Sequence, residues 1–294
     1  MQNFPRLITA MITPFKDDYS VDFEGAQKLA LQLIEEGSQG LVISGTTGES
    51  PSLSKEEKLD LFKAIKEAVE SKAWVIAGTG SNSTFDTARF TEEAARTGVD
   101  GVMLVTPYYN KPTQAGLYQH FKTVAEAVDL PIILYNVPGR TGINLLPDTV
   151  VKLADVRNIV ALKEACGNLD QVSELKTKLP EEFYVYSGDD SLTLPMMAVG
   201  CYGIISVVAH VVGKQMSAMI NAYLAGDIQK AAQIHLQLYP IFKALFVVSN
   251  PIPVKKALEL MGRPAGKLRL PLVEPLPAET EVIREALKKV GVLS

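Results

Sequence analysis

The 294-residue sequence predicts an α/β protein built as a closed (β/α)8 barrel, the TIM-barrel architecture, with a helical region appended at its C-terminal end. The first observation is a set of eight short runs rich in Val, Ile, Leu and aromatic residues. Their first residues lie about 20 to 34 residues apart, which is typical of strand–helix units. The second observation is that strand-like runs then cease. Eight parallel strands are enough to close a barrel.

The predicted strands are the eight apolar runs. They are Leu7–Phe15, Gly40–Ser44, Trp74–Gly78, Gly101–Thr106, Pro131–Asn136, Ile159–Lys163, Phe183–Ser187 and Gly203–Val208. Between them, Ser54 and Glu57 form a capping box, and Gly37 and Gly98 stand where a left-handed residue commonly ends a helix. The alternative is an open doubly wound sheet, whose nucleotide-binding form needs a glycine-rich turn after its first strand; the sequence has 13–15, Thr-Pro-Phe, there.

The helical region is predicted from the residues that follow the last strand. No strand-like run occurs from Lys214 onward, and helical patterns are separated by breaks. The breaks are Gly226, Pro251-Ile252-Pro253, Gly262 and Leu270–Pro277. We therefore expect a barrel over residues 1–224 and a helical region over residues 225–294.

Composition excludes several classes of protein. A net charge of −4 and the lack of a Lys/Arg block argue against a nucleic-acid-binding surface. Cys166 and Cys201 cannot form a disulfide framework, and the first residues do not form a signal-peptide pattern. Ser191–Gly213 has no charged residue, but Pro, Gly, Ser and His interrupt it, so we expect a buried helix, a turn and a buried strand. We expect a cytoplasmic protein without a membrane or nucleic-acid partner.

Lys163 ends the sixth predicted strand and is the strongest candidate for chemistry. A buried position penalises its ammonium form and favours the neutral amine, which can form a Schiff base with a keto substrate. The alternative is a lysine that extends into solvent beside Glu164.

Other polar residues follow strands at the same predicted end of the barrel. Residues 45–48, Gly-Thr-Thr-Gly, could form a carboxylate cradle from backbone N–H groups and hydroxyls, or only a tight turn. Tyr108 and Tyr109 could be rim packing, whereas Tyr135 ends the strand next to that of Lys163 and could transfer protons. Arg140 is either a solvated loop charge or a fork for a carboxylate.

Metal and phosphate sites are not predicted. Asp189 and Asp190 have no His or further carboxylate nearby in the sequence, so Asp190 or Ser191 is expected to cap the next helix. The loops after the seventh and eighth strands lack the glycine-rich phosphate-binding pattern. Cys166 is expected to be a packing residue. The combined pattern predicts that a small 2-oxo acid forms an imine with Lys163, loses a proton and attacks an aldehyde as the enamine.

The motifs at these positions resemble a known family. They are Gly45-Thr46-Thr47-Gly48-Glu49-Ser50, Thr106-Pro107-Tyr108-Tyr109-Asn110, Leu134 to Gly142, Leu162-Lys163-Glu164-Ala165, Ser187-Gly188-Asp189-Asp190 and Asn250 to Lys255. The chain resembles the pyruvate-dependent class I aldolases that include N-acetylneuraminate lyase. Arg140 and the paired threonines make it similar to the 4-hydroxy-tetrahydrodipicolinate (dihydrodipicolinate) synthases within that superfamily.

The resemblance implies a reaction, an assembly and a role for each site residue. The reaction is condensation of pyruvate with L-aspartate 4-semialdehyde to 4-hydroxy-tetrahydrodipicolinate, the first committed step toward diaminopimelate and lysine. No cofactor is implied beyond the covalent Lys163–pyruvate imine, and the implied assembly is a homotetramer of two tight dimers. The resemblance implies that Lys163 forms the Schiff base and that Tyr135 transfers protons through Thr46 and a neighbouring subunit's Tyr109. It implies that Thr47, Gly188 and Ile205 line the pyruvate site. Arg140 is implied to bind the carboxylate of the semialdehyde.

A possible effector site is also implied by the resemblance. Lysine-inhibited members bind lysine at positions that correspond to Ser50, Lys55, Asn82, Asp86 and Tyr108. Those members carry a histidine and a glutamate where this chain has Lys55 and Asp86. Because an ammonium at Lys55 repels the ammonium of lysine, we expect weak or absent lysine inhibition.

Two other functions are weighed against this one. The first is a lyase of the same fold that acts on a sialic acid or a 2-keto-3-deoxy sugar acid, for which Arg140 is poorly suited. The second is a non-catalytic barrel that binds a ligand, which is disfavoured because the sequence fills every position that the chemistry needs.

Overall fold

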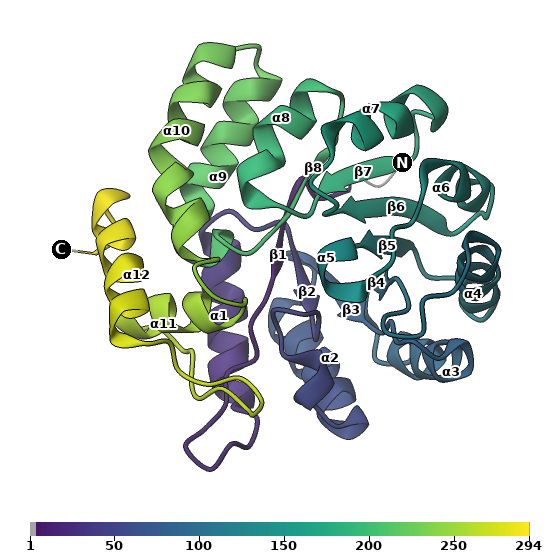
Figure 1. Ribbon diagram of the computed structural model, residues 1–294. Helices are drawn as coiled ribbons and strands as arrows, with labels where there is room; N and C mark the ends of the chain where they lie inside the picture. Colours follow the sequence, from purple (N-terminus) through teal and green to yellow (C-terminus); the bar gives the residue numbers. More distant parts are fainter. Residues whose placement is uncertain (1–3, 294) are drawn as a thin grey trace.

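A computed structural model describes residues 4–293 and contains the predicted barrel (Figure 1). Within those residues, eight parallel strands pair in sequence order, and the last closes on the first. The strands are β1 (Leu7–Ala10), β2 (Gly40–Ile43), β3 (Trp74–Gly78), β4 (Gly101–Val105), β5 (Ile132–Asn136), β6 (Ile159–Glu164), β7 (Tyr184–Ser187) and β8 (Gly203–Ser206). The predicted fold class is confirmed.

Helices cover the outside of the barrel and follow its strands in turn. They are α1 (Phe23–Glu35), η1 (Ser50–Ser52), α2 (Lys55–Val69), α3 (Thr84–Ala95), α4 (Gln114–Glu126), α5 (Pro138–Thr141), α6 (Pro147–Ala154), α7 (Leu169–Lys178), η2 (Asp190–Leu192), α8 (Thr193–Ala198) and α9 (Ala209–Leu224). The Ser54–Glu57 capping box is present, and Gly37 and Gly98 have φ of +107° and +83°, as predicted. Within residues 4–293, no helix is both long and apolar enough to cross a membrane.

The helical region after the barrel contains three further helices. They are α10 (Ile228–Ala244), α11 (Ile252–Leu260) and α12 (Pro277–Lys289). Figure 1 shows them together on one side of the barrel, where α10 and α11 pack on α9 and both contact α12. Gly226 and Gly262 lie outside these helices at positive φ, as the predicted breaks require. The preceding helix, α9, ends at Leu224.

Two strands, β1 and β8, are shorter than their predicted apolar runs by two residues or more. β1 ends at Ala10 because the chain then leaves the sheet, and Phe15 is buried against Val21 and Gly266 instead. β8 ends at Ser206 because the N–H groups of Val207 and Val208 donate to the Asp190 carboxylate, at 3.1 and 3.2 Å, rather than to a strand. An apolar run in the sequence indicates buried residues, whether a strand or a loop buries them. Here the ends of the two runs are buried in loops.

Side chains inside the barrel form a core separate from the one between strands and helices. Members of the inner core include Ile8, Val42, Ile133, Ala161 and Ile205. Because successive side chains on a strand point to opposite faces, Lys163 shares the inward face with Ala161, and Tyr135 shares it with Ile133. The barrel therefore carries the lysine and the tyrosine at the carboxyl-terminal end of an apolar interior.

Candidate active site

Lys163 lies in β6 between two tyrosines of the neighbouring strands. Its Cα pairs in register with those of Tyr135 and Tyr186, and its Nζ lies 4.2 Å from the centroid of the Tyr135 ring. The side chain is buried at 5% exposure, and this burial lowers the pKa of Lys163 to about 8, although the charge of Asp190 raises it. At pH 7, roughly one tenth of the amine is then neutral, against roughly one in 3,000 for an ordinary lysine.

Glu164 does not pair with Lys163, so the alternative of a solvated Lys163–Glu164 pair is wrong. The Glu164 carboxylate accepts hydrogen bonds from Asn136 Nδ2 at 2.9 and 3.0 Å, from the Cys166 N–H at 2.8 Å and from Gln171 Nε2 at 3.2 Å. Lys163 takes part in none of the ion pairs among residues 4–293. The buried amine is therefore unneutralised and free to react.

Tyr135 is placed to hold a proton beside this amine. It is buried at the end of β5, and burial raises the pKa of its phenol, while the charge of Arg140 and a hydrogen bond with Thr46 lower it. The phenol therefore stays protonated at neutral pH and can donate to a developing negative charge. Thr46, on the loop after β2, connects it to the rest of the site.

The loop after β2 provides unpaired donors. Its turn is closed by hydrogen bonds from the Gly48 N–H to the Gly45 oxygen at 3.1 Å and from the Glu49 N–H to the Thr46 oxygen at 3.1 Å. Within residues 4–293, the backbone N–H groups of Thr46 and Thr47 have no acceptor. Two such N–H groups beside two hydroxyls can receive a carboxylate.

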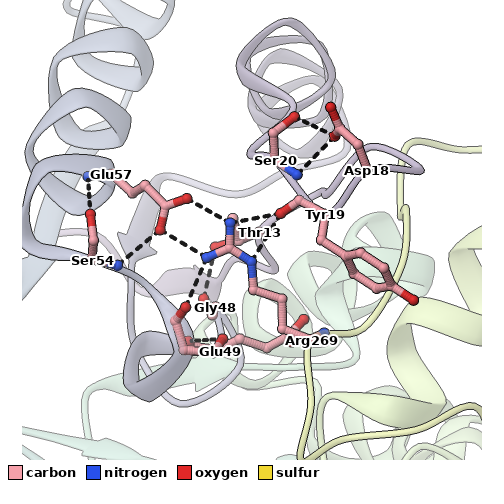
Figure 2. A network of polar contacts seen from close by, with 10 residues as sticks. Thr13, Asp18, Tyr19, Ser20, Gly48, Glu49, Ser54, Glu57 and Arg269 are labelled. Atoms are coloured by element: carbon pink, nitrogen blue, oxygen red, sulfur yellow. Dashed lines mark hydrogen bonds and ion pairs between the residues drawn. The ribbon is translucent and has the colours of Figure 1, made fainter.

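The helical region holds this loop in place. Lys255 of α11 forms a buried ion pair with Glu49 at 2.6 Å. Figure 2 shows Arg269 between the loops, where its guanidinium donates to Glu57, to the Tyr19 carbonyl and to the Ser52 carbonyl. In the same view the Thr13 hydroxyl donates to the Gly48 carbonyl at 2.8 Å.

A cavity of about 610 Å³ opens at this end of the barrel. Thr46, Tyr135 and Arg140 line it, and so do Ser50, Lys55, Asp86 and Tyr108 of the possible effector site. Among described residues, the lining does not include Lys163, Thr47, Tyr109, Gly188, Ile205 or Asn82. One cavity thus connects part of the predicted active site with most of the predicted effector site.

Three further predicted residues, Gly188, Ile205 and Thr47, lie outside the lining of this cavity. A Cβ atom on Gly188 would come within 3.2 Å of Lys163 Cε and 2.7 Å of Ala165 Cβ, so only glycine fits beside the lysine. Ile205 belongs to the inner core and is 1% exposed. Thr47 belongs to the loop after β2 and is 3% exposed. Lys163 itself contacts the ring of Tyr135, which lines the cavity.

Tyr109 is the predicted residue that the single chain leaves away from the site. Its side chain is 88% exposed, and its φ of +73° is unusual for a residue with a Cβ atom. The backbone thus holds a large aromatic side chain in solvent, outside the lining of the cavity of its own chain.

The sequence and structure match a known family along almost the whole chain. Residues 3–290 match the model of the dihydrodipicolinate synthetase family. The chain belongs to this family. A 4-hydroxy-tetrahydrodipicolinate synthase from Desulforamulus reducens is 57% identical over 292 residues, 99% of each chain, and one from a Cyanothece species is 55% identical over all of both chains.

Solved structures of family members have the same fold. The dihydrodipicolinate synthase of Cyanidioschyzon merolae, solved with lysine bound, is 45% identical, has a TM-score of 0.97 and covers 99% of each chain. That of Acinetobacter baumannii, solved as a complex with pyruvate, is 43% identical with a TM-score of 0.95, covering 98% of this chain and 99% of that one. The predicted family and its lyase class are confirmed.

Four of the five predicted effector residues, all but Asn82, line the cavity. Lys55 forms an ion pair with Glu93 at 2.6 Å, and Arg89 approaches the same carboxylate at 3.5 Å. Asn82 accepts a hydrogen bond from Asn110 through its carbonyl. Lys58 also lines the cavity, and burial lowers its pKa. It was not among the predicted residues. Lys55, Lys58 and Arg89 all line the cavity on this side.

One expectation about the loop after β7 is wrong. Asp189, rather than Asp190 or Ser191, caps the short helix η2, through its carboxylate and the Ser191 N–H at 2.8 Å. Asp190 is buried and accepts from the Ser206 hydroxyl at 2.5 Å and from two backbone N–H groups. Burial raises the pKa of Asp190 to about 6 and places its charge where it acts on Lys163.

Two further results concern the cysteine and the possibility of a metal. Burial raises the pKa of Cys166 to about 12, which suits a packing residue better than a reactive thiol. Among residues 4–293, no three His, Cys, Asp or Glu side chains gather as metal ligands do. Asn250 was not among the predicted site residues, because nothing in the sequence around it indicates that it lies beside the loop after β2.

Proposed function

We propose that this protein is a lyase that condenses pyruvate with L-aspartate 4-semialdehyde through an imine on Lys163. The observation that carries the proposal is the buried, unpaired Lys163 amine, 4.2 Å from the centre of the Tyr135 ring at the end of the barrel. The family and the names of its members support the choice of substrates. The product is 4-hydroxy-tetrahydrodipicolinate, on the route to diaminopimelate and lysine.

The first half of the reaction activates pyruvate. The neutral Lys163 amine attacks the pyruvate keto carbon, and loss of water gives the imine. Tyr135 gives its proton to the departing water, its oxygen then takes a proton from the methyl carbon, and the electron pair left on that carbon forms the enamine. The free N–H groups of Thr46 and Thr47 support a site for the pyruvate carboxylate, with Gly188 and Ile205 against the rest of the molecule.

The second half joins the two substrates and releases the enzyme. The enamine carbon attacks the aldehyde carbon, and the new alkoxide takes a proton from Tyr135. The amino group of the second substrate then attacks the imine carbon and displaces Lys163, which closes the ring. One water is lost for each pair of substrates. Arg140, at the cavity wall, would hold the carboxylate of the semialdehyde.

A homo-oligomer is part of the proposal because Tyr109 is exposed. In a dimer its phenol would enter the partner's site and complete a proton relay through Thr46 to Tyr135. The exposed ring and its positive φ support this placement. We expect a tetramer made from two tight dimers, in the cytoplasm, with no cofactor.

Weak lysine inhibition is the corresponding proposal for the outer cavity. The ammonium of Lys55 is held there by Glu93 and would repel the ammonium of free lysine. Asp86 is one methylene shorter than the glutamate of lysine-inhibited members. The test is inhibition by lysine at saturating substrates; a submillimolar inhibition constant would contradict the proposal.

The deciding experiment traps the imine. The protein is incubated with pyruvate, reduced with borohydride and analysed by intact mass and peptide mapping. A pyruvate-sized adduct on Lys163 supports the proposal, and an equal adduct on the Lys163→Ala variant contradicts it. A panel of aldehydes offered with pyruvate then separates condensation with aspartate 4-semialdehyde from cleavage or synthesis of sugar acids.

A further inference from the structure

Asn250 connects the helical region to both predicted carboxylate-binding groups. It lies between α10 and α11 and is 6% exposed. Its Nδ2 donates to the Thr47 hydroxyl oxygen at 2.9 Å, and its backbone carbonyl accepts from Arg140 Nη2 at 3.2 Å. Residues distant in sequence thus meet at one residue of the helical region.

The direction of the Asn250–Thr47 hydrogen bond determines what Thr47 can do. A hydroxyl has one proton to donate and can accept two hydrogen bonds, whereas an amide NH₂ group only donates. Because Asn250 Nδ2 donates to the Thr47 oxygen, the Thr47 proton remains for another acceptor. Within residues 4–293, the Thr47 hydroxyl has no second partner.

The opposite orientation of the amide is less favourable. It would use the Thr47 proton on Asn250 Oδ1 and would leave both protons of a buried NH₂ group without an acceptor. In the present orientation the atom left without a partner is the Asn250 Oδ1 oxygen. Among the described residues, each orientation leaves two hydrogen-bonding groups unpaired, one N–H and the oxygen in the present orientation and two N–H groups in the opposite one, and a buried oxygen without a partner is tolerated better than a buried N–H without one.

Asn250 is also held firmly. Glu49, two residues after Thr47, forms its ion pair with Lys255, five residues after Asn250. Arg269 binds Glu57 and the Tyr19 carbonyl on the same side of the barrel (Figure 2). These contacts fix the two chain segments that carry Asn250 and Thr47 against one another.

We infer that Asn250 is a positioning residue that directs the Thr47 hydroxyl proton toward a carboxylate bound in the cradle of the β2 loop. The inference deepens the proposed function and rests on it: the carboxylate is that of the 2-oxo acid that forms the imine. Asn250 touches no reacting atom. It acts by holding the oxygen of Thr47, so that the proton and the two backbone N–H groups of Thr46 and Thr47 converge on one anion.

The Asn250→Asp variant tests the direction of the hydrogen bond with almost no change of shape. Its carboxylate accepts the Thr47 proton and leaves none for the substrate. The readout is the pyruvate concentration that gives half-maximal borohydride trapping. We expect this concentration to rise about tenfold or more. The KM for aspartate 4-semialdehyde should change less than about twofold, because Arg140 is held by the backbone carbonyl.

The Asn250→Leu and Thr47→Val variants provide a second test that needs no buried charge. Each should raise the half-maximal pyruvate concentration by about threefold to tenfold, and the double variant should match Thr47→Val alone, because Asn250 acts only through Thr47. Circular dichroism and the melting temperature confirm folding. Additive effects, or unchanged pyruvate dependence in folded variants, would overturn the inference. If the unaltered protein traps no pyruvate, the proposed function itself fails.

Discussion

Two lysines are buried in this protein, one in the barrel and one in the helical region. Lys163 is 5% exposed and Lys255 is 3% exposed, and burial lowers the pKa of both. Each Nζ lies over an aromatic ring, at 4.2 Å from the centroid of Tyr135 and 4.4 Å from that of Phe15. By burial and aromatic contact alone, the two would be equivalent candidates for the same chemistry.

The partners of the two ammonium groups distinguish them. Lys255 donates to Glu49 at 2.6 Å and to the Lys267 carbonyl at 2.6 Å, so its charged form is compensated. Lys163 has no ion pair among residues 4–293, and the Tyr135 ring that its Nζ contacts lines the cavity. A buried lysine becomes a nucleophile when its neutral form is accessible and its charge is left without a partner, and only Lys163 meets both conditions.

The largest expected effect on activity comes from replacing Lys163. Lys163→Ala should abolish the borohydride-stable pyruvate adduct and lower kcat by at least about a thousandfold, because the covalent route is lost. The measurement is intact mass after reduction, with steady-state assays alongside. A residual adduct that maps to Lys255 would break the comparison.

Loss of the second lysine should reduce stability rather than chemistry. Lys255→Met leaves Glu49 buried without its partner and should cost about 3–5 kcal/mol of unfolding free energy in urea. The control Lys256→Met removes ion pairs with the exposed carboxylates of Glu259 and Glu274 and should cost about 0–1 kcal/mol. The double variant Glu49→Gln, Lys255→Met should recover part of the lost unfolding free energy, because it no longer buries an unpaired charge. Equal losses in the Lys255 and Lys256 variants would show that the buried pair is unimportant.

The pH dependence of trapping should report the pKa of Lys163. Because the neutral amine reacts and the pKa of Lys163 is lowered to about 8, the rate of imine formation should rise about tenfold per pH unit below 8 and level off above it. Rapid-quench borohydride trapping from pH 6 to 9.5 measures the profile. A rate that continues to rise above pH 9 would mean that burial does not lower the pKa of Lys163.

The smallest expected effect concerns Asp190. Its charge raises the pKa of Lys163, so Asp190→Asn should shift the midpoint of the same pH profile below 8, by about one unit or less. Asp189→Asn is the matched control, because the Asp189 carboxylate caps η2. A shift to higher pH, or the same shift in both variants, would remove Asp190 from the electrostatics of the site.

Local patterns predicted most of the barrel and the residue types at its carboxyl-terminal end. The periodic apolar runs identified all eight strands, because parallel strands buried on both faces read as continuous hydrophobic segments. The ends of β1 and β8 were predicted too long, since Phe15 and Val208 are buried by other contacts. Lys163 and Tyr135 were brought together as their adjacent strands required.

Contacts between distant segments could not be predicted in the same way. Asn250 meets Thr47 across more than two hundred residues, and Asp190 reaches the backbone after β8. Both are determined by three-dimensional packing and leave no periodic signal in the sequence. Tyr109 differs from these residues because it is exposed in the single chain, and its proposed contact is with a partner subunit.

The clamp formed by Lys255 and Arg269 has a consequence for protein synthesis. During translation the eight strands emerge from the ribosome before these two residues exist, and chains fold from the N-terminal end as they emerge. The barrel can close early, but the loop with Thr46 and Thr47 has no clamp until Arg269 has been added. We therefore expect the strand with Lys163 to be made long before the contacts of Lys255 and Arg269 hold the loop with Thr46 and Thr47 in place.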